Sequence, residues 1–327
     1  MPIVNEPLLL GLEVGGTKLQ LVAGASPRHI LFRQRITVER AWGASAICGQ
    51  IKGALDQWAG IRWRAAGVGF GGPVDWRSGR ICCSHQVDGW KDLNFRSWLE
   101  GLIDAPVAVE NDANLAALAE ARYGAGYDFN PVFYTNSGSG VGGGLIMDER
   151  IYHGASPGEA EFGQLRIAPD GLTVEDHCSG WAVDRKIREL CDEEPLSELA
   201  GIVGLERGGE ARHLAAALAA GNKSARHIVE ETAAILAFAL SHVVHLFHPE
   251  VIVLGGGLAL IGEPWRASVA QGLPGHLVAA FRPGPKVRLA ALGEDVVPCG
   301  ALALAGSLDG VNFNSTPARQ LDSEPIP

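Results

Sequence analysis

Short hydrophobic runs alternate with glycine-rich turns and with segments of helical periodicity along the chain. Residues 8–13 predict a buried strand, Gly15-Gly16 a turn and 19–23 a second strand, so the chain opens with a β-hairpin. Residues 29–38 predict a third strand, and the apolar positions of 44–58 recur at helical spacing. The N-terminal part therefore has the pattern of a sheet followed by a helix.

The rest of the chain continues this alternation. Strands are expected at 66–70, 107–110, 132–135, 145–147, 151–152 and 251–254, and helices at 113–123, 182–191, 210–219, 223–247 and 295–307. A strand, a glycine-rich turn placed at 138–144 and another strand repeat the opening of the chain. The pattern predicts α/β layers in two similar lobes with a cleft between them.

A chain of 327 residues is long for one compact core and fits two domains. We expect a small lobe over 1–112, completed by the helix at 295–309, and a large lobe over 113–294. The polar, proline-containing segment 310–327 is expected to be a disordered tail.

Composition narrows the class of protein. The formal net charge is -10 and no basic run occurs, which argues against a nucleic-acid partner. Six cysteines without a regular framework are typical of reduced thiols in a cytoplasmic protein. The N-terminus lacks the pattern of a signal peptide, and the apolar stretch near 232–247 is interrupted by His242 and His245, so a buried helix is favoured over a membrane span.

Three glycine clusters, at 15–18, 138–144 and 255–257, each follow an apolar strand. Glycine in such a place lets backbone N–H groups approach phosphate oxygens. For one cluster alone a tight turn is the favoured explanation, but three clusters at strand ends shift the balance towards phosphate binding. Two familiar motifs do not apply. The glycines of 138–144 match a dinucleotide fingerprint, and residues 11–18 nearly match a P-loop, but in both cases a strand follows where those motifs need a helix.

The segment 109–114 places Glu110, Asn111 and Asp112 where a buried strand meets a helix. A carboxylate there either caps the helix or serves as the base that takes a proton from an attacking hydroxyl. Glu13, at the end of the first strand, is placed to act on Mg²⁺ through water, and Lys18 to neutralise phosphate charge; the alternatives are a solvent-facing carboxylate and an exposed strand lysine.

Taken together, these segments resemble the ROK (repressor, ORF, kinase) family of bacterial sugar kinases and sugar-responsive repressors. The matching pieces are LEVGGTK (12–18), GVGFGGPVD (67–75), VENDANLAALAEARYGAG (109–126), SGSGVGGGLIMDERIYHGA (137–155), GEAEFGQ (158–164) and VIVLGGGL (251–258). They keep the family's order and spacing over about residues 8–307, and the set is specific where any single piece is weak.

The resemblance implies an actin-like ATPase (ribonuclease H-like) fold that closes over ATP and a hexose, and usually a homodimer. Asp112 becomes the catalytic base, and the expected reaction is phosphorylation of a hexose or hexose derivative at the 6-OH. The implied sugar-binding residues are Gly71, Gly72, Asn111, Asp112, Glu161 and Gln164. Those implied for ATP and Mg²⁺ are Glu13, Gly15, Gly16, Thr17, Lys18, Ser137, Gly138, Ser139, Gly140, Gly255, Gly256 and Gly257.

Departures from the family pattern bear on substrate and metal. Gln164 replaces a histidine that commonly contacts the sugar and ligates zinc, and the cysteine-rich zinc motif is reduced to Cys178, so no structural zinc is expected. Glu13 replaces the aspartate of many members. The segment 84–86 replaces a typical Pro-Asn pair, so a sugar contact there is expected to differ.

Two other functions stay open. A sugar-responsive regulator would carry a DNA-binding segment before the first phosphate motif, which here begins within about a dozen residues of Met1. A catalytically weak sugar- or nucleotide-binding protein would fit the loss of the histidine and the zinc, although it has no need of Asp112. His85 and His153 lie near matched sites without a partner visible in the sequence, which favours a structural or exposed role for each.

Overall fold

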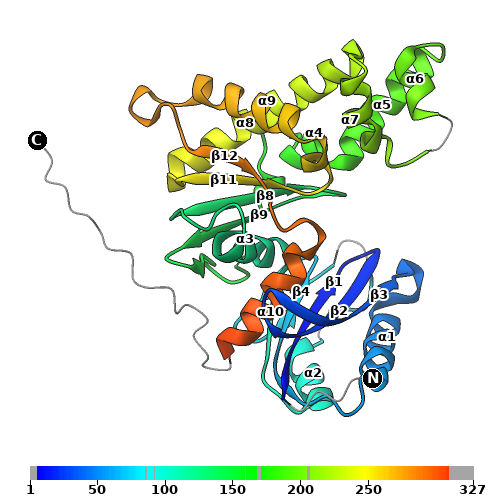
Figure 1. Cartoon of the computed structure of the whole chain (residues 1–327), viewed down its shortest axis with the longest axis vertical. Helices are drawn as coiled ribbons and strands as arrows, with labels where there is room; N and C mark the ends of the chain where they lie inside the picture. Colours follow the sequence, from blue (N-terminus) through cyan, green and yellow to red (C-terminus); the bar gives the residue numbers. More distant parts are fainter. Residues whose placement is uncertain are drawn as a thin grey trace, which may run out of the picture.

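The computed structural model describes residues 6–84, 87–91, 93–158, 160–167, 171–204 and 207–308. The segment 310–327, predicted to be a disordered tail, lies outside the described residues, as does His85. Two five-stranded sheets form the framework, one in each half of the molecule. They face each other across a middle layer of helices (Figure 1).

The first sheet is built entirely from the N-terminal part of the chain. Its strand order is β3 (His29–Thr37), β2 (Lys18–Ser26), β1 (Leu8–Val14), β4 (Trp63–Phe70) and β7 (Val107–Asn111). β1 to β3 form an antiparallel meander, whereas β4 and β7 run parallel to β1. This half also contains α1 (Gly43–Gln57), α2 (Phe95–Ile103) and a small hairpin of β5 (Val74–Asp75) and β6 (Arg80–Ile81).

The second sheet repeats this topology. Its order is β10 (Arg150–Ile151), β9 (Val141–Met147), β8 (Val132–Ser137), β11 (Val251–Gly255) and β12 (Lys286–Leu289). β8 pairs antiparallel with β9 and parallel with β11, as β1 does with β2 and β4. The helices of this half are α4 (Val174–Cys178), α5 (Gly180–Glu193), α6 (Glu198–Val203), α7 (Leu214–Ala219), α8 (Lys223–Phe247) and α9 (Glu263–Gly272). The duplication predicted from the glycine-rich hairpins is therefore present in the fold.

Two helices join the halves. α3 (Asp112–Tyr123) packs on β8 and β9, α10 (Val296–Leu308) packs on β1 and β4, and the two helices pack on each other. Close approach depends on glycine, because an added Cβ on Gly67 of β4 would collide with the carbonyl of Ala301, and one on Gly300 with the carbonyl of Leu115. The lobe boundaries given from the sequence stay a prediction, since this middle layer contacts both sheets.

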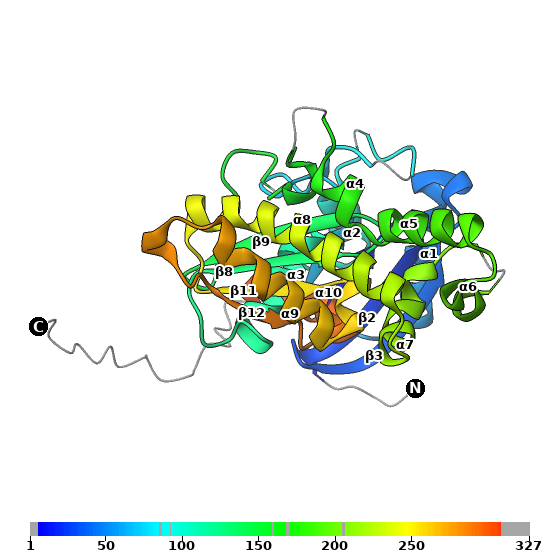
Figure 2. The ribbon, with the colours of Figure 1, turned by 90° about the horizontal axis from the view of Figure 1, so that it is seen from above.

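The longest helix, α8, crosses the outer face of the second sheet (Figure 2). By length and composition alone it could span a membrane, but 61% of its most apolar window is buried inside the protein. Its residues Ala233, Leu236 and Leu240 belong to the core of this half. That burial is typical of a core helix, as the sequence led us to expect.

Some predicted boundaries were wrong. The glycine-rich turn expected over 138–144 is shorter, because β9 already begins at Val141 and its glycines pack on α3, where an added Cβ on Gly144 would lie 2.7 Å from Ala117 Cβ. The helix expected over 210–219 starts as a 3₁₀ turn, Glu210–His213, before α7. The sequence analysis also missed α2, α9 and β12, whose short patterns are ambiguous without their tertiary partners.

Candidate active site

The first group of predicted site residues gathers at the carboxyl ends of β1, β4 and β7. An added Cβ on Gly71 would lie 3.3 Å from Asp112 Oδ2 and 3.8 Å from Gly15 Cα, so the three positions are neighbours. The Gly71 N–H donates to the carbonyl of Val14 (3.0 Å), which ties the end of β4 to the first glycine turn. Because these strands are parallel, their ends meet at one edge of the sheet, where ligands of α/β proteins bind.

Asn111 and Asp112 have separate roles at the start of α3. Asn111 is the N-cap: its Oδ1 accepts from the N–H groups of Ala113 (2.9 Å) and Asn114 (3.2 Å), and its Nδ2 donates to the carbonyl of Gly72 (3.3 Å). Asp112 is the first residue of the helix. The capping role considered for Asp112 therefore belongs to Asn111, which leaves the Asp112 carboxylate available for chemistry.

The electrostatics of Asp112 suit its predicted role as general base. Its pKa is raised from an ordinary 3.8 to about 7, mainly by desolvation and then by the negative charges of Glu13 and Glu161, against the lowering effect of backbone N–H groups. The residue is nevertheless partly exposed, so it keeps access to a ligand in the cleft. A carboxylate with a pKa near neutrality is suited to accept a proton from a hydroxyl.

Glu13 is held by a network that the sequence analysis did not detect. Lys18 Nζ lies 2.9 Å from Glu13 Oε1, and the buried Gln20 donates through Nε2 to Glu13 Oε2 (3.0 Å). Gln20 Oε1 in turn accepts from Arg35 Nε (2.7 Å) and Arg33 Nη1 (3.3 Å), which fixes the orientation of its amide. Glu13 is thus a mostly buried, ion-paired carboxylate, and Lys18 is its partner rather than a free strand lysine.

The second group of predicted residues lies on the other sheet, where the ends of β8 and β11 are adjacent. Gly256 has φ of 78° and packs on the last residue of β8, because an added Cβ would lie 2.6 Å from backbone atoms of Ser137. The backbones of the Ser137–Gly140 and Gly255–Gly257 clusters therefore lie next to each other and form one continuous surface. Thr17 lies in the turn between β1 and β2, and Ser139 lies in the turn between β8 and β9. Both predicted phosphate loops are therefore at strand ends.

Glu175 is a further residue that the sequence analysis missed. It lies on α4, and its Oε2 accepts from the N–H of Val141 (2.9 Å), directly after the Ser137–Gly140 loop. An added Cβ on Gly140 would lie 2.5 Å from the same oxygen. Glu175 therefore sets the position of the Ser137–Gly140 segment. Nothing in the local sequence separates it from other acidic residues in a first helical turn.

Glu161 directly precedes a short 3₁₀ turn, Phe162–Gln164, and Gln164 ends it; both side chains are exposed. They line a cavity of about 470 Å³ whose other walls are largely apolar and include Phe133, Leu145 and Phe247. The negative charge of Glu161 also raises the pKa of Asp112. The two predicted sugar ligands therefore line this cavity, whereas Asp112 does not.

The residues that could bind zinc and those that could bind Mg²⁺ are different. Within the described ranges, no three His, Cys, Asp or Glu side chains are grouped so that they could hold a metal ion, and Cys178 is buried, with its Sγ 3.7 Å from the carbonyl of Thr232. The absence of zinc stays a prediction. For Mg²⁺, the Glu13 carboxylate is the type of oxygen donor that this cation prefers, and its charge acts on Asp112; its role in binding Mg²⁺ stays a prediction.

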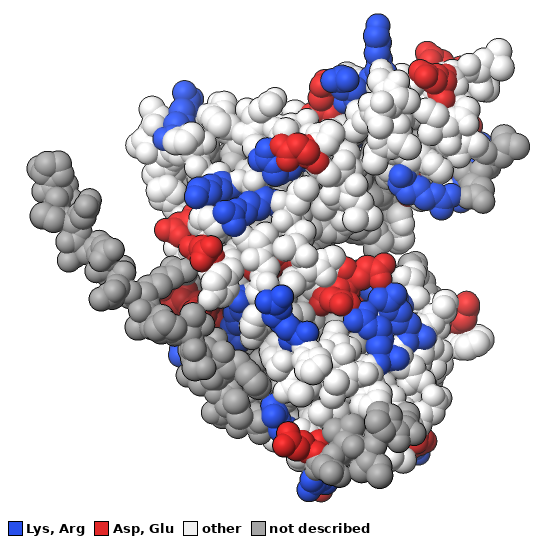
Figure 3. All heavy atoms as spheres, in the orientation of Figure 1, with Lys and Arg blue, Asp and Glu red and all other residues white. Residues whose placement is uncertain are grey.

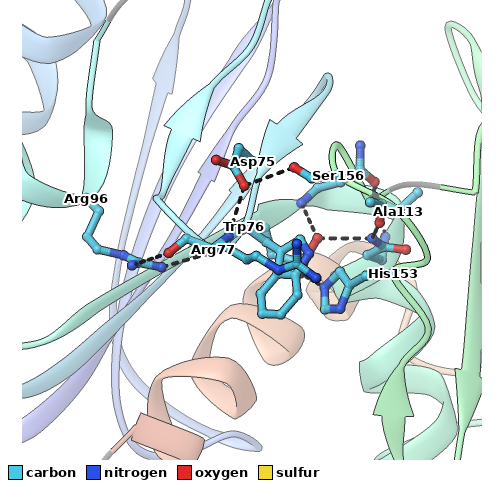
Figure 4. A network of polar contacts seen from close by, with 11 residues as sticks. Asp75, Trp76, Arg77, Arg96, Ala113, His153 and Ser156 are labelled. Atoms are coloured by element: carbon cyan, nitrogen blue, oxygen red, sulfur yellow. Dashed lines mark hydrogen bonds and ion pairs between the residues drawn. The ribbon is translucent and has the colours of Figure 1, made fainter.

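His153 is not the isolated side chain that the sequence suggested. Its Nε2 lies 2.6 Å from Glu110 Oε2, and its ring stacks on Trp76 at 4.1 Å between centroids. Glu110 is buried and directly precedes the Asn111-Asp112 pair. Figure 4 shows the loop that carries His153 and Ser156 facing the loop that carries Asp75 and Trp76.

Comparison with known proteins places this site in context. The family model described as "ROK family" matches residues 9–307, nearly all of the described chain. The chain belongs to the ROK family. A glucokinase of Halalkalibacterium halodurans is 28% identical over 310 residues, which is 89% of this chain and 93% of the relative. An N-acetyl-D-glucosamine kinase of Salmonella paratyphi A is 28% identical over 298 residues, 87% of this chain and 94% of the relative.

Among solved structures, a ROK glucokinase of Streptomyces griseus in complex with glucose and AMPPNP is 29% identical and superposes with a TM-score of 0.80 over 92% of this chain and 99% of the other. The ROK protein described here therefore has the actin-like ATPase fold, as predicted. On the face seen in Figure 3, Lys and Arg side chains occur in small groups next to Asp and Glu rather than in one basic strip.

Proposed function

We propose that this ROK protein is an ATP-dependent sugar kinase that transfers a phosphoryl group to a hydroxyl of a hexose or hexose derivative, with Asp112 as general base. The observation that carries the proposal is the Asp112 carboxylate, free of the helix cap and with a pKa raised to about 7. A pure binding protein or a regulator has no need of such a group. Membership of a family with glucokinase relatives supports the same activity.

In this mechanism the sugar lies against Gly71, Gly72 and the Asn111-Asp112 pair, with Glu161 and Gln164 on its other side. Asp112 accepts the proton of the attacking hydroxyl, which we propose to be the 6-OH. Since phosphoryl transfer depends mainly on positioning and charge stabilisation, one correctly placed carboxylate is sufficient as the base. Gln164 offers both a donor and an acceptor to a hydroxyl, which supports binding without the family's histidine.

ATP is proposed to place its phosphates on the loops 15–18 and 137–140, with the 255–257 cluster against the adenosine. Backbone N–H groups of these glycine loops and the ammonium group of Lys18 would bind the phosphate oxygens. Lys18 would have to leave Glu13 in order to do so, because it forms the ion pair of 2.9 Å in this structure. Mg²⁺, held through Glu13 and water, would supply positive charge to the phosphates.

The proposed substrate is a simple hexose or an N-acylated one, since a glucokinase and an N-acetyl-D-glucosamine kinase are each 28% identical to this chain. We also propose a cytoplasmic homodimer with no nucleic-acid partner. Exposed apolar side chains on one side of the large half, among them Tyr152, Leu246 and Phe247, support an association surface. Light scattering coupled to size exclusion would give the oligomeric state.

The test is ADP release with ATP, Mg²⁺ and a panel of glucose, fructose, mannose, N-acetylglucosamine and N-acetylmannosamine, run beside Asp112→Asn. We expect sugar-dependent turnover in the wild type and a loss of about 10²- to 10⁴-fold in the variant. A protein that is stabilised by a sugar but turns over none of them would instead be a binding protein or regulator of the same family.

A further inference from the structure

Glu110 organises the segment that carries the catalytic carboxylate. Its side chain is almost fully buried at the end of β7. One oxygen, Oε1, accepts from the backbone N–H of Asn111 (2.9 Å) and from Asn114 Nδ2 (3.0 Å). These contacts bracket Asp112 on both sides in sequence. The position of Glu110 therefore determines the position of the β7–α3 junction.

The other oxygen of Glu110 depends on a residue from the opposite half of the molecule. His153 follows β10 of the second sheet, and its Nε2 lies 2.6 Å from Glu110 Oε2. Because a carboxylate only accepts hydrogen bonds, Nε2 is the donor. A buried carboxylate that loses such a partner carries the full penalty of desolvation. His153 is thus positioned to satisfy Glu110 only while the two halves are together.

A second set of contacts holds His153 in this place. Its ring stacks on Trp76, which lies in the β5–β6 turn of the first half, with an interplanar angle of 14°. Nearby, Ser156 Oγ donates to Asp75 Oδ1 (3.1 Å) across the same boundary. The turn itself is fixed by Arg96, which donates to the carbonyls of Trp76 (2.8 Å) and Arg77 (2.7 Å), as Figure 4 shows. His153 is therefore held between Trp76 and Glu110, two residues of the opposite half.

We propose that His153 is a positioning residue of the phosphoryl transfer: from the large half it reaches across to Glu110, and thereby orders the Asn111-Asp112 junction only when the halves are closed. The proposal rests on the proposed kinase function for its effect on turnover, but not for its effect on the junction. In this proposal the two contacts of His153 have different roles. The hydrogen bond to Glu110 orders the base, and the stack on Trp76 stabilises closure.

Three variants separate these tasks. His153→Phe keeps an aromatic ring for Trp76 but leaves Glu110 Oε2 without its donor. His153→Gln keeps a donor and loses the ring. Trp76→Ala removes the stack and leaves the hydrogen bond. His227→Phe, at an exposed position of α8, is the matched control. All are compared with the wild type by thermal unfolding, so that a variant that does not fold is recognised.

In steady-state kinetics we expect His153→Phe to lower kcat about 10- to 100-fold, because small displacements of a catalytic group have effects of this size, while the KM for ATP stays unchanged. His153→Gln should keep kcat within about 3-fold of the wild type, since its amide still donates to Glu110. Trp76→Ala should raise the KM for the sugar about 3- to 10-fold with little change in kcat. Equal losses of kcat in His153→Phe and His153→Gln would overturn the proposal.

Hydrogen–deuterium exchange gives a readout that does not depend on turnover. Amides of 110–114 should exchange faster in His153→Phe than in the wild type, by about 10-fold or more, and should stay protected in His153→Gln and His227→Phe. Unchanged protection in His153→Phe would refute the role of His153. A wild type without turnover on any sugar would refute the proposed function, and the exchange result would still decide whether His153 orders the junction.

Discussion

Replacing Asp112 by Asn is expected to inactivate the enzyme and at the same time to stabilise it. The pKa of Asp112 is about 7 in the folded protein against an ordinary 3.8, so between these pH values the native state binds more protons than the unfolded state. Stability is therefore present at low pH and lost as the pH rises towards 7. A difference of about three pKa units corresponds to about 4 kcal/mol, which is an upper limit because Asp112 is partly exposed to the cleft.

Asparagine has nearly the same shape and keeps one oxygen that accepts backbone hydrogen bonds, but it never ionises. At pH 8 Asp112→Asn should therefore be more stable than the wild type by up to about 4 kcal/mol, and its Tm higher by several degrees. At pH 4.5 the difference should shrink to about 1 kcal/mol. At this pH the folded carboxyl is protonated, and only the ionisation of the unfolded chain between pH 3.8 and 4.5 still favours unfolding of the wild type. The measurement is thermal and urea unfolding across this pH range without Mg²⁺ or nucleotide, since a bound cation would itself stabilise the ionised carboxylate.

The same pKa predicts the pH dependence of catalysis. Because the base acts only when it is ionised, kcat/KM of the wild type should fall below a pH of about 7. Asp176→Asn is a control of opposite sign, since hydrogen bonds from Thr173 lower the pKa of Asp176 and its loss should not stabilise the protein. An Asp112→Asn variant no more stable than the wild type at pH 8, or one that keeps sugar-dependent turnover, would refute the reasoning.

Three further outcomes follow from the packing and the hydrogen bonds. Gln20→Met should raise the Mg²⁺ concentration for half-maximal turnover about 10-fold, because Gln20 orients Glu13; an unchanged Mg²⁺ titration would contradict this role. Gly67→Ala should lower the free energy of unfolding by about 1–3 kcal/mol, because the added methyl group overpacks against α10. Gly53→Ala, with open space around it, should raise the free energy of unfolding by up to about 1 kcal/mol. Urea unfolding compares the two variants, and equal effects would refute the packing argument. Cys178, buried and with a pKa raised to about 12 by desolvation, should resist a thiol reagent at pH 8 until urea unfolds the protein, and rapid labelling of the native protein at this site would contradict its burial.

The candidate active site could be proposed from the sequence because its parts are local. A strand followed by glycines and another strand predicts a phosphate loop, and the Glu110-Asn111-Asp112 junction lies within three consecutive residues. Such features depend on backbone geometry that neighbouring residues specify. The alternation of strands and helices likewise predicted an α/β fold in which the strand–turn–strand start occurs twice, since each element has its own hydrophobic periodicity.

The network around the base could not be predicted, because its members are distant in sequence. Gln20 and the arginines of β3 hold Glu13, and Glu175 holds a loop more than thirty residues before it in the chain. His153 meets Glu110 across the boundary between the halves. No periodicity or motif encodes such pairings, since they arise only when two sheets and the helices between them are packed.

The sequence by itself determined the fold class, the position of Asp112 and the places of the glycine loops, because each is set by residues close together in the chain. Tertiary structure alone decided which side chain caps α3, why the pKa of Asp112 is raised, and which residue of the second half reaches Glu110. The physical reason is that burial, charge proximity and hydrogen bonding between distant segments exist only after packing. These interactions raise the pKa of Asp112 to about 7, which is the property that the proposed base needs.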